Sequence, residues 1–440
     1  MTKFDVLKKH YGHTSFRPAQ EALIDALLSE RDVLGIMPTG AGKSICYQIP
    51  AMMLSGVTIV VSPLISLMKD QVAQLRQADL PVAYLNSSLT VAQSQEALRR
   101  ANQGRYKIIY VAPERLTSES FIDFAQETDI SLIAVDEAHC VSQWGQDFRP
   151  GYLRISNFVD ALPKRPIIGA FTATATTAVK RDIIRLLKLN EPLNLTTGFD
   201  RPNLYFEVAT PKDKLSYLYE LIGSRKGACG IIYCSTRKIV ESVCSKIERL
   251  GISVTRYHAG LDSAERQRNQ DDFISGKADI IVATNAFGMG IDKPNVRFVI
   301  HYNMPKNMES YYQEAGRAGR DGNPSECILL FSEDDIKTAE YFMKSSEKNK
   351  DLTEKERRIV GRRDIESLEK MVRYCEMESC LRVYMLRYFG EKMKGTCQNC
   401  SNCNRPAWWQ IWRRNKYSRQ NEQLVQQEPT RMTVLGIEIR

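Results

Sequence analysis

Short apolar segments recur along most of the chain, and stretches with helical character separate them. The first set is Val57–Val61, Lys107–Val111, Ser131–Val135 and Ile167–Phe171. The second set is Gly230–Cys234, Asp279–Ala283, Arg297–His301 and Glu326–Phe331. Strands that are buried on both faces of a parallel sheet form continuous apolar runs, and helices connect such strands. The pattern therefore predicts an α/β fold of two lobes with mostly parallel sheets.

The pattern also indicates where the parts of the chain begin and end. We expect the junction between the lobes near Thr197–Asn203, and strand-like runs stop near Met343, where charge rises through Glu354–Arg363. The predicted parts are a first lobe (1–198), a second lobe (199–342), a helical module (343–403) and a tail (404–440). The tail carries seven basic residues against three acidic ones and three of the four tryptophans. We expect it to be a disordered terminus, with contacts to DNA or a partner as the alternative.

Composition narrows the class of protein. A length of 440 residues corresponds to about three domains at roughly 150 residues each. The net charge of +9 suggests a polyanionic partner, although the hint is weak by itself. The sequence has neither an apolar run long enough to span a membrane nor the apolar core of a signal peptide. We therefore expect a cytoplasmic protein, nucleoid-associated if it is bacterial, whose eleven cysteines do not form a disulfide framework.

A glycine-rich segment, Met37-Pro-Thr-Gly-Ala-Gly-Lys-Ser44, follows the apolar run Val33–Ile36 and precedes a helix-like stretch. Such a loop presents backbone N–H groups and a helix N-terminus to phosphate oxygens. The strict pattern has glycine where this chain has Met37. The predicted nucleotide-binding residues of the loop are Thr39, Gly40, Gly42, Lys43 and Ser44. We expect Lys43 to reach the β- and γ-phosphates of ATP and Ser44 to bind Mg²⁺.

Two acids, Asp136 and Glu137, follow the run Ser131–Val135. The carboxyl ends of parallel strands are where α/β sheets bind ligands. We expect Asp136 to hold Mg²⁺ and Glu137 to orient and deprotonate an attacking water. Upstream of the loop, Arg17 and Gln20 either stack on and hydrogen-bond to an adenine or simply begin an exposed helix.

Four cysteines have the spacing of metal ligands: Cys380, Cys397, Cys400 and Cys403 read C-x16-C-x2-C-x2-C. Four thiolates fit a closed tetrahedral zinc site, and zinc can supply folding energy that a small module lacks. An iron–sulfur cluster is the rival interpretation, because C-x2-C-x2-C also begins ferredoxin-type runs. However, neither a further cysteine nor a proline follows Cys403 at ferredoxin spacing.

From about residue 4 to residue 403 the chain resembles the RecQ family of DNA helicases, within the larger superfamily of DEAD/DEAH-type motors. The resemblance rests on motifs along the whole of this span. They include Phe16-Arg-Pro-Ala-Gln20, the phosphate loop, Asp136-Glu-Ala-His-Cys140, Ser142-Gln-Trp-Gly-Gln-Asp-Phe-Arg149, Thr172-Ala-Thr-Ala175, Tyr257-His-Ala-Gly260 and Gln313-Glu-Ala-Gly-Arg-Ala-Gly-Arg320. It implies two RecA-like lobes and an ATPase that moves 3′ to 5′ on single-stranded DNA and unwinds tailed duplexes, in repair or recombination. It leaves protein partners and oligomeric state open, and a monomer is compatible with it.

The resemblance also implies roles for individual residues. Arg320 is expected to be an arginine finger for ATP, Arg317 to contact phosphate or hold the interface, and Asp292 to belong to the nucleotide site. Residues expected to contact DNA or couple it to hydrolysis are Gln143, Trp144, Phe148, Arg149, Thr172, Thr174, Arg237, His258 and Thr284. Cys375 lies outside the family's zinc pattern and is expected not to bind the metal.

The chain departs from the family in three places. Gln146 and His13 stand where a histidine and an aromatic ring are common. Only 37 residues follow Cys403, too few for the winged helix that often comes next. An ATP-gated translocase, clamp or annealing protein is therefore the main alternative to a helicase, and an RNA helicase is a second one.

Overall fold

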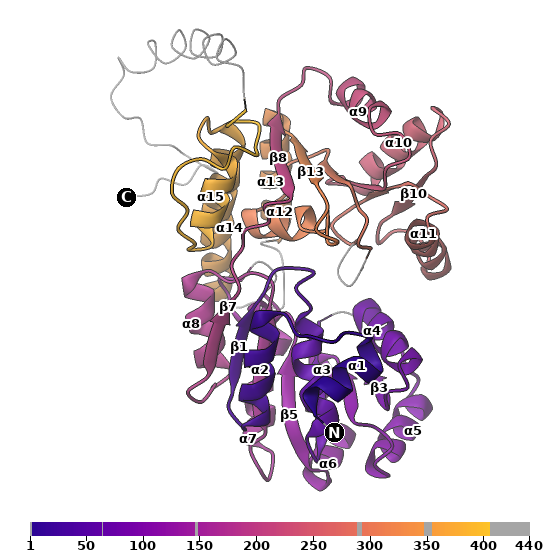
Figure 1. The fold of residues 1–440 in the computed structure, drawn as a ribbon, viewed down its shortest axis with the longest axis vertical. Helices are drawn as coiled ribbons and strands as arrows, with labels where there is room; N and C mark the ends of the chain where they lie inside the picture. Colours follow the sequence, from indigo (N-terminus) through magenta and orange to yellow (C-terminus); the bar gives the residue numbers. More distant parts are fainter. Residues whose placement is uncertain (1, 64, 146–147, 288–292, 347–353, 405–440) are drawn as a thin grey trace. The chain divides into compact units, whose positions relative to one another are not determined.

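The structure is a computed structural model that describes residues 2–63, 65–145, 148–287, 293–346 and 354–404 (Figure 1). The predictions made for Gln146, Asp292 and most of the tail, 405–440, lie outside these residues. The chain divides into two compact units. Among the described residues, the first unit comprises residues 2–200, Lys293 and Phe389–Glu391, and the second unit begins at Arg201 and comprises the other described residues.

The described part of the first unit contains a seven-stranded parallel sheet in the order β3-β4-β2-β5-β6-β1-β7. Its strands are β1 (Val33–Ile36), β2 (Val57–Val61), β3 (Val82–Leu85), β4 (Ile108–Val111), β5 (Ile130–Val135), β6 (Ile167–Thr172) and β7 (Leu193–Thr196). The interior strands β1, β2 and β4 are buried at every position, as a sheet covered by helices on both faces requires.

Helices alternate with these strands. They are α1 (Lys3–Tyr11), α2 (Pro18–Leu28), α3 (Lys43–Met53), α4 (Ile65–Gln77), α5 (Val91–Asn102), α6 (Glu119–Glu127), α7 (Arg154–Asp160) and α8 (Thr177–Leu186), with 3-10 turns η1 (Pro113–Thr117), η2 (Ala138–Val141) and η3 (Pro150–Leu153). One core joins α2, α3 and α4 to the sheet through buried residues such as Leu23, Tyr47 and Val72. Apolar burial of this kind contributes about 25 cal/mol per Å² and holds the strand ends in place.

The described part of the second unit contains a six-stranded parallel sheet in the order β10-β11-β9-β12-β13-β8. Its strands are β8 (Leu204–Ala209), β9 (Gly230–Tyr233), β10 (Val254–Tyr257), β11 (Ile280–Ala283), β12 (Phe298–His301) and β13 (Ser325–Leu330). Its helices are α9 (Lys214–Gly223), α10 (Arg237–Glu248), α11 (Ser263–Ser275) and α12 (Met308–Ala315). A core of apolar residues from α9 and α10 packs on this sheet. The predicted fold class, two lobes with parallel sheets, is thus confirmed.

The C-terminal helices belong to the second unit. They are α13 (Glu333–Ser346), α14 (Glu354–Glu376) and α15 (Leu381–Tyr388), and an irregular segment with the last three of the four cysteines follows them. The segment closes over the outer strand β8, because Ser401 N donates to Phe206 O over 2.8 Å. Arg382, which is buried, places its guanidinium 5.2 Å from the Phe206 ring centre and donates to Arg201 O over 2.6 Å. An edge strand that would otherwise expose unpaired backbone is covered in this way.

Within the described ranges, each helix is too short or too polar to cross a lipid bilayer.

Candidate nucleotide, nucleic-acid and zinc sites

The predicted phosphate loop connects β1 to the N-terminus of α3, as the sequence indicated. Gly40 and Gly42 have φ angles of 83° and 77°, in the left-handed region that favours glycine. A Cβ on Gly42 would also lie 2.4 Å from Gln20 Nε2, so a side chain at this position would displace the Gln20 amide. Lys43 Nζ donates to Met37 O over 3.2 Å, which bends the side chain back over its own loop. The arrangement gives phosphate oxygens a helix N-terminus and a lysine together.

Arg17 and Gln20 brace the same loop from α2. Gln20 is buried and its Nε2 donates to Ala41 O and Gly42 O over 3.1 Å each, while its Oε1 accepts from Arg17 N over 2.9 Å. Arg17 itself donates to Gly40 O over 2.5 Å. Both side chains therefore touch the backbone that would surround phosphate. The sequence suggested either an adenine contact or an exposed helix start for these two residues and did not predict this contact with the phosphate loop.

The two predicted acids follow β5 at the carboxyl edge of the same sheet. Asp136 is buried, and its carboxylate accepts from Glu137 N over 3.0 Å. Burial, together with the neighbouring Glu137 carboxylate, raises the pKa of Asp136 to about 7, whereas Lys43 acts in the opposite direction. Tyr152 fixes the backbone here by donating to Asp136 O over 2.9 Å. Asp136, whose charged form is disfavoured by burial, thus lies near Lys43 of the phosphate loop.

His139 connects Glu137 to the next strand. Its Nδ1 lies 3.3 Å from Glu137 Oε2 and 2.8 Å from Thr172 Oγ1. The Thr172 hydroxyl donates to Thr174 O over 3.1 Å, so Thr172 Oγ1 is the acceptor toward His139 and Nδ1 carries the proton. Sequence reasoning gave His139 no role, although it stands in the Asp136–His139 motif. The structure brings Thr172, Thr174 and the acids into one buried network.

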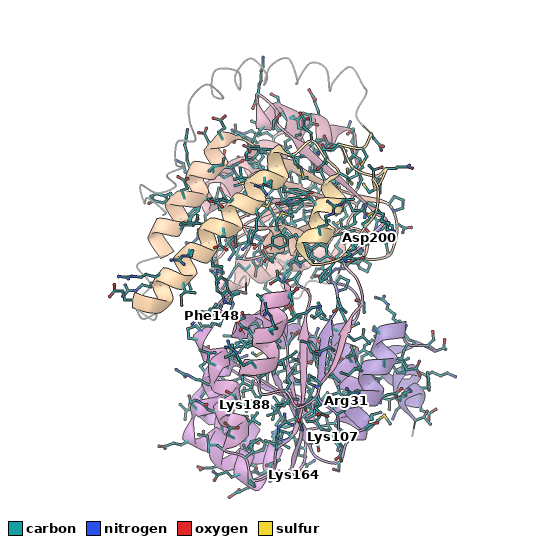
Figure 2. All side chains as sticks on the ribbon, turned by 90° about the vertical axis from the view of Figure 1, so that its left-hand side faces the viewer. Arg31, Lys107, Phe148, Lys164, Lys188 and Asp200 are labelled. Atoms are coloured by element: carbon teal, nitrogen blue, oxygen red, sulfur yellow. The ribbon has the colours of Figure 1, made fainter. Side chains whose placement is uncertain are left out.

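The predicted aromatic loop begins directly after η2. Trp144 is 45% exposed, which excludes a simple core role, and Phe148 is half-buried. Figure 2 shows Phe148 at the opposite end of the first unit from Lys107, which precedes β4, and from Lys164. The loop therefore lies at the carboxyl ends of the strands. Arg149 anchors its far side by donating to Pro63 O over 2.6 Å, and Gln143 is half-buried.

In the second unit, Arg317 and Arg320 follow α12. Arg317 is buried and Arg320 is half-buried. Gly319 between them has a φ of 54°, and a Cβ there would lie 2.5 Å from Asn203 Nδ2. Burial raises the pKa of Tyr233 to about 12, and the Arg317 guanidinium acts against this rise. The turn between the arginines is therefore fixed by packing that tolerates only glycine.

Three other predicted residues gather at the carboxyl edge of the second sheet. Arg237 begins α10 after β9, His258 follows β10, and Thr284 follows β11. His258 accepts from Gly260 N at Nδ1 over 3.2 Å, so its Nε2, 2.7 Å from Glu241 Oε1, is the donor. Gly260 lies against Arg237, whose Cδ would be 3.0 Å from an added Cβ.

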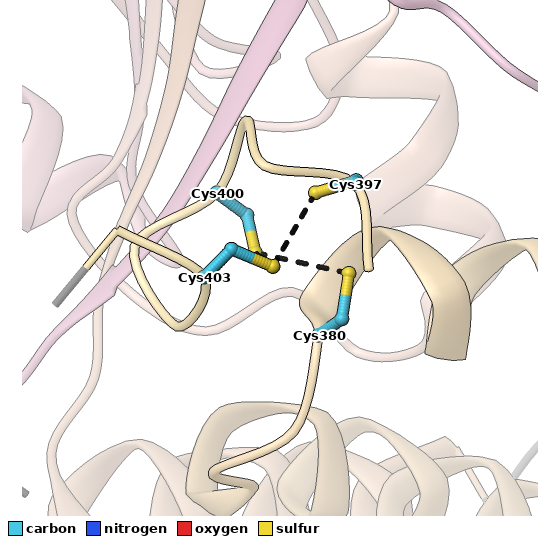
Figure 3. A group of neighbouring side chains, drawn as sticks. All are labelled: Cys380, Cys397, Cys400 and Cys403. Atoms are coloured by element: carbon cyan, nitrogen blue, oxygen red, sulfur yellow. Dashed lines mark hydrogen bonds between the residues drawn. The ribbon is translucent and has the colours of Figure 1, made fainter. Parts of the chain in front are cut away.

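The four predicted metal ligands come together in the second unit (Figure 3). The sulfurs of Cys380, Cys397, Cys400 and Cys403 all lie within 4.8 Å of one another. Three of the sulfur–sulfur distances are 3.4, 3.8 and 4.0 Å. Four sulfurs around a tetrahedral zinc at about 2.3 Å would be separated by roughly 3.8 Å, so the cluster has the dimensions of a zinc site. Among the described residues Cys375 is buried and outside this group.

Comparisons with known proteins agree with this geometry. A family model of DEAD/DEAH box helicases matches residues 17–182, and one of helicase conserved C-terminal domains matches residues 213–322. A third model, for the RecQ zinc-binding module, matches residues 333–404 and includes all four cysteines. The chain belongs to the RecQ family. The third match also favours zinc over an iron–sulfur cluster in this RecQ chain.

Relatives and solved structures extend the comparison. The RecQ chain is 45% identical over 399 residues to the ATP-dependent DNA helicase RecQ of Bacillus subtilis, covering 90% of the chain and 66% of the relative. It is 42% identical to the ATP-dependent DNA helicase RecQ of Pasteurella multocida, covering 92% of the chain and 62% of that relative. The chain therefore spans just under two thirds of the length of these relatives.

Two solved structures share the fold. The helicase Mss116p, bound to single-stranded RNA and AMP-PNP, has a TM-score of 0.64 at 19% identity, over 80% of this chain and 76% of that one. The helicase MrfA, bound to DNA, has a TM-score of 0.64 at 18% identity, over 75% of this chain and 51% of that one. At such identities the likeness concerns the fold alone.

Proposed function

We propose that this RecQ chain is an ATP-dependent DNA helicase that moves 3′ to 5′ on single-stranded DNA and unwinds tailed duplexes. The observation that carries the proposal is the grouping at one sheet edge of a phosphate loop, an acidic pair and an exposed aromatic loop. His139 links the acids to Thr172 in that group. The names of the bacterial relatives, ATP-dependent DNA helicases, support the same reading.

The first unit would bind and cleave ATP. Lys43 would release Met37 O and donate to the β- and γ-phosphates, while the backbone from Thr39 to Ser44 would surround them. Glu137 would orient the attacking water and accept its proton. Arg17 and Gln20 would hold the loop and contact the adenine.

The residues around Asp136 fit Mg²⁺. Carboxylate and hydroxyl oxygens, here from Asp136 and Ser44, are the ligands that Mg²⁺ prefers. A divalent cation beside Asp136 would favour the charged carboxylate that burial disfavours. When bound, Mg²⁺ neutralises charge on the phosphate oxygens. Asp136 and Ser44 would orient it.

Residues of the second unit would complete the cycle. We assign the arginine finger to Arg320, which would stabilise charge on the transferring phosphoryl group, and interface or phosphate contacts to Arg317. Asp292 keeps its assignment to the nucleotide site. Arg237, His258 and Thr284 would contact the DNA backbone. Trp144 and Phe148 would stack on bases, at about 1–3 kcal/mol per base, and Gln143, Arg149, Thr172 and Thr174 would transmit binding to Glu137.

We further propose that the protein acts in the cytoplasm, in DNA repair or recombination.

Strand displacement tests the function directly. Duplexes with a 3′ or a 5′ single-stranded tail are incubated with ATP and Mg²⁺, and Lys43→Ala serves as the blank. Displacement from the 3′-tailed duplex alone is the expected result. DNA-stimulated ATP hydrolysis without displacement would instead indicate a translocase or clamp, and stimulation by RNA in preference to DNA would indicate an RNA helicase.

A further inference from the structure

A hydrogen-bond relay fixes the start of the exposed aromatic loop to a distant helix. Trp144 N donates to Ser142 Oγ over 3.1 Å, and Ser142 Oγ donates to Asp182 Oδ2 over 2.7 Å. Asp182 lies on α8, 40 residues further along the chain. Its other oxygen, Oδ1, accepts from Arg185 over 2.7 Å.

The relay has a direction. A hydroxyl has one hydrogen to donate, and the Asp182 carboxylate takes it, so a lone pair of Ser142 Oγ faces the Trp144 N–H. Ser142 is fully buried, and Asp182 has 14% of its side chain exposed, so water competes little with either bond. Without the carboxylate, the hydroxyl would be free to turn away from Trp144 N.

The neighbouring backbone at the start of the aromatic loop is fixed by other contacts. The relay is therefore the contact whose loss can change the position of Trp144. Gly145 N donates to Ser142 O over 2.9 Å, and a Cβ on Gly145 would lie 2.2 Å from His139 O. The backbone on both sides of Trp144 is therefore held against η2, while Trp144 as a whole residue is 45% exposed. The position of the indole ring therefore depends on the hydrogen bond that Trp144 N donates to Ser142 Oγ.

We propose that Asp182 is a positioning residue that sets the indole of Trp144 in the orientation that receives a nucleic-acid base. The carboxylate acts through Ser142 and does not itself touch nucleic acid. Because α8 follows Thr172 and Thr174 in the chain, the relay also connects the loop to the segment that contacts His139. The role in base binding rests on the proposed function, whereas the positioning of the indole does not.

Tryptophan fluorescence tests the positioning alone. Replacing Trp408, Trp409 and Trp412 with phenylalanine leaves Trp144 as the only tryptophan. In this background we expect Ser142→Ala and Asp182→Ala to change the acrylamide quenching of Trp144 equally, without ATP or DNA. The double variant should change it no further, because both substitutions break one relay. Unchanged quenching in either variant overturns the proposal.

Matched variants distinguish the loss of the relay from a non-specific effect of substitution on the fold. Asp182→Asn retains an oxygen that can accept from Ser142, so its quenching should stay close to that of the parent. Arg185→Ala removes the exposed partner of Oδ1 but leaves the Ser142 bond, and Asp160→Asn removes a surface ion pair with Lys188. Both should match the parent in quenching. If Asp182→Ala fails to fold, Ser142→Ala with Asp182→Asn still decides the question.

ATP hydrolysis stimulated by an oligothymidine strand tests the link to function. For Asp182→Ala we expect the half-stimulating strand concentration to rise about fivefold or more, the lower end of what one lost base stack is worth. Asp182→Asn should rescue it. An unchanged half-stimulating concentration overturns the role in base binding. If the parent shows no stimulation while quenching changes as expected, the proposed function fails and the positioning role stands.

Discussion

His139 Nδ1 lies 2.8 Å from Thr172 Oγ1, a contact between the turn after β5 and the end of β6. The two residues are 33 positions apart, and parallel pairing of β5 with β6 brings them together. The same His139 nitrogen is 3.3 Å from Glu137 Oε2. A shift of the strand end that carries Thr172 would therefore move the histidine that contacts Glu137, the carboxylate to which we assign the attacking water.

The first prediction concerns this contact. Thr172→Val keeps the shape of the side chain but removes the acceptor of His139, so Glu137 should lose its fixed orientation. We expect strand-stimulated ATP turnover to fall by about 10- to 100-fold, the size of effect that small misplacements of catalytic groups produce. ATP affinity should remain within a few-fold of the parent. Steady-state kinetics and nucleotide binding measure the two quantities.

Thr128→Val is the matched control, because Thr128 directly follows α6 and its hydroxyl bonds only weakly, over 3.5 Å, to Asn102. It should leave turnover unchanged. A Thr172→Val protein with normal turnover would show that the contact does not transmit anything to Glu137.

The second prediction separates ATP hydrolysis from strand binding. Lys43→Ala removes the only side-chain cation of the phosphate loop, so turnover should be abolished. Strand binding should persist and should weaken steeply with salt in both proteins, since counterion release dominates phosphate contacts. Fluorescence anisotropy of a labelled strand at several salt concentrations measures it.

Lys164→Ala provides the comparison, because Lys164 is an exposed lysine at the other end of the first unit (Figure 2). It should preserve both activities. Loss of strand binding in Lys43→Ala would mean that the ATP site and the strand site are not independent.

Sequence patterns found the interior of both sheets but not their borders. All eight predicted apolar runs overlap strands, and the unpredicted strands are β3, β7, β8 and β10. These four stand at the edges of the two sheets. An edge strand has fewer covered positions: β7 alternates between half-buried and exposed, and β10 is half-buried throughout. Continuous apolar runs therefore cannot mark β7 and β10. The explanation does not extend to β3, which is apolar and mostly buried and was simply missed.

The site divides in the same way. Lys43, the acids and the four cysteines lie in local motifs whose spacing indicates the chemistry. The cysteine cluster is confirmed, whereas the roles of Lys43 and the acids stay predictions. The contact of His139 with Thr172 and the contact of Ser142 with Asp182 depend on which segments are neighbours in the fold. The spacing of residues within a local motif carries no information about such neighbours. Gln20 shows most clearly what the sequence could not predict. The glutamine residue type suggested a contact with adenine, whereas in the structure its amide contacts the backbone of the phosphate loop.

The third prediction uses two glycines with the same backbone geometry. Gly42 and Gly104 have φ angles of 77° and 70°, so alanine at either position costs about 1–2 kcal/mol of backbone strain. Only at Gly42 would the new Cβ meet another group, Gln20 Nε2 at 2.4 Å, whereas nothing lies within 4 Å at Gly104. We expect both variants to lose similar stability, but only Gly42→Ala to lose ATP binding, by about tenfold or more.

Thermal melting and titration with a fluorescent ATP analogue measure these effects. Equal ATP affinity in the two variants would show that the Gln20 contact is not needed to shape the loop.

The fourth prediction concerns the metal. We expect one zinc per chain by elemental analysis, and Cys400→Ser to lose it, because the Cys400 sulfur is fully buried and lies 4.0 and 3.4 Å from the sulfurs of Cys380 and Cys403. Structural zinc contributes about 10–16 kcal/mol in small metal-folded peptides, so its loss should release the segment that covers β8. Proteolysis near Ser401 should then accelerate, since the bond from Ser401 N to Phe206 O would open.

Cys375→Ser is the matched control, because Cys375 is a buried cysteine of the same module that lies outside the cluster. It should keep its zinc and its resistance to proteolysis. A chelator should reproduce the effect of Cys400→Ser, because a cleft of about 470 Å³ opens beside Cys380 and Cys403. If Cys400→Ser retained one zinc per chain, or lost it without faster cleavage, the cluster would not be what holds this segment on β8.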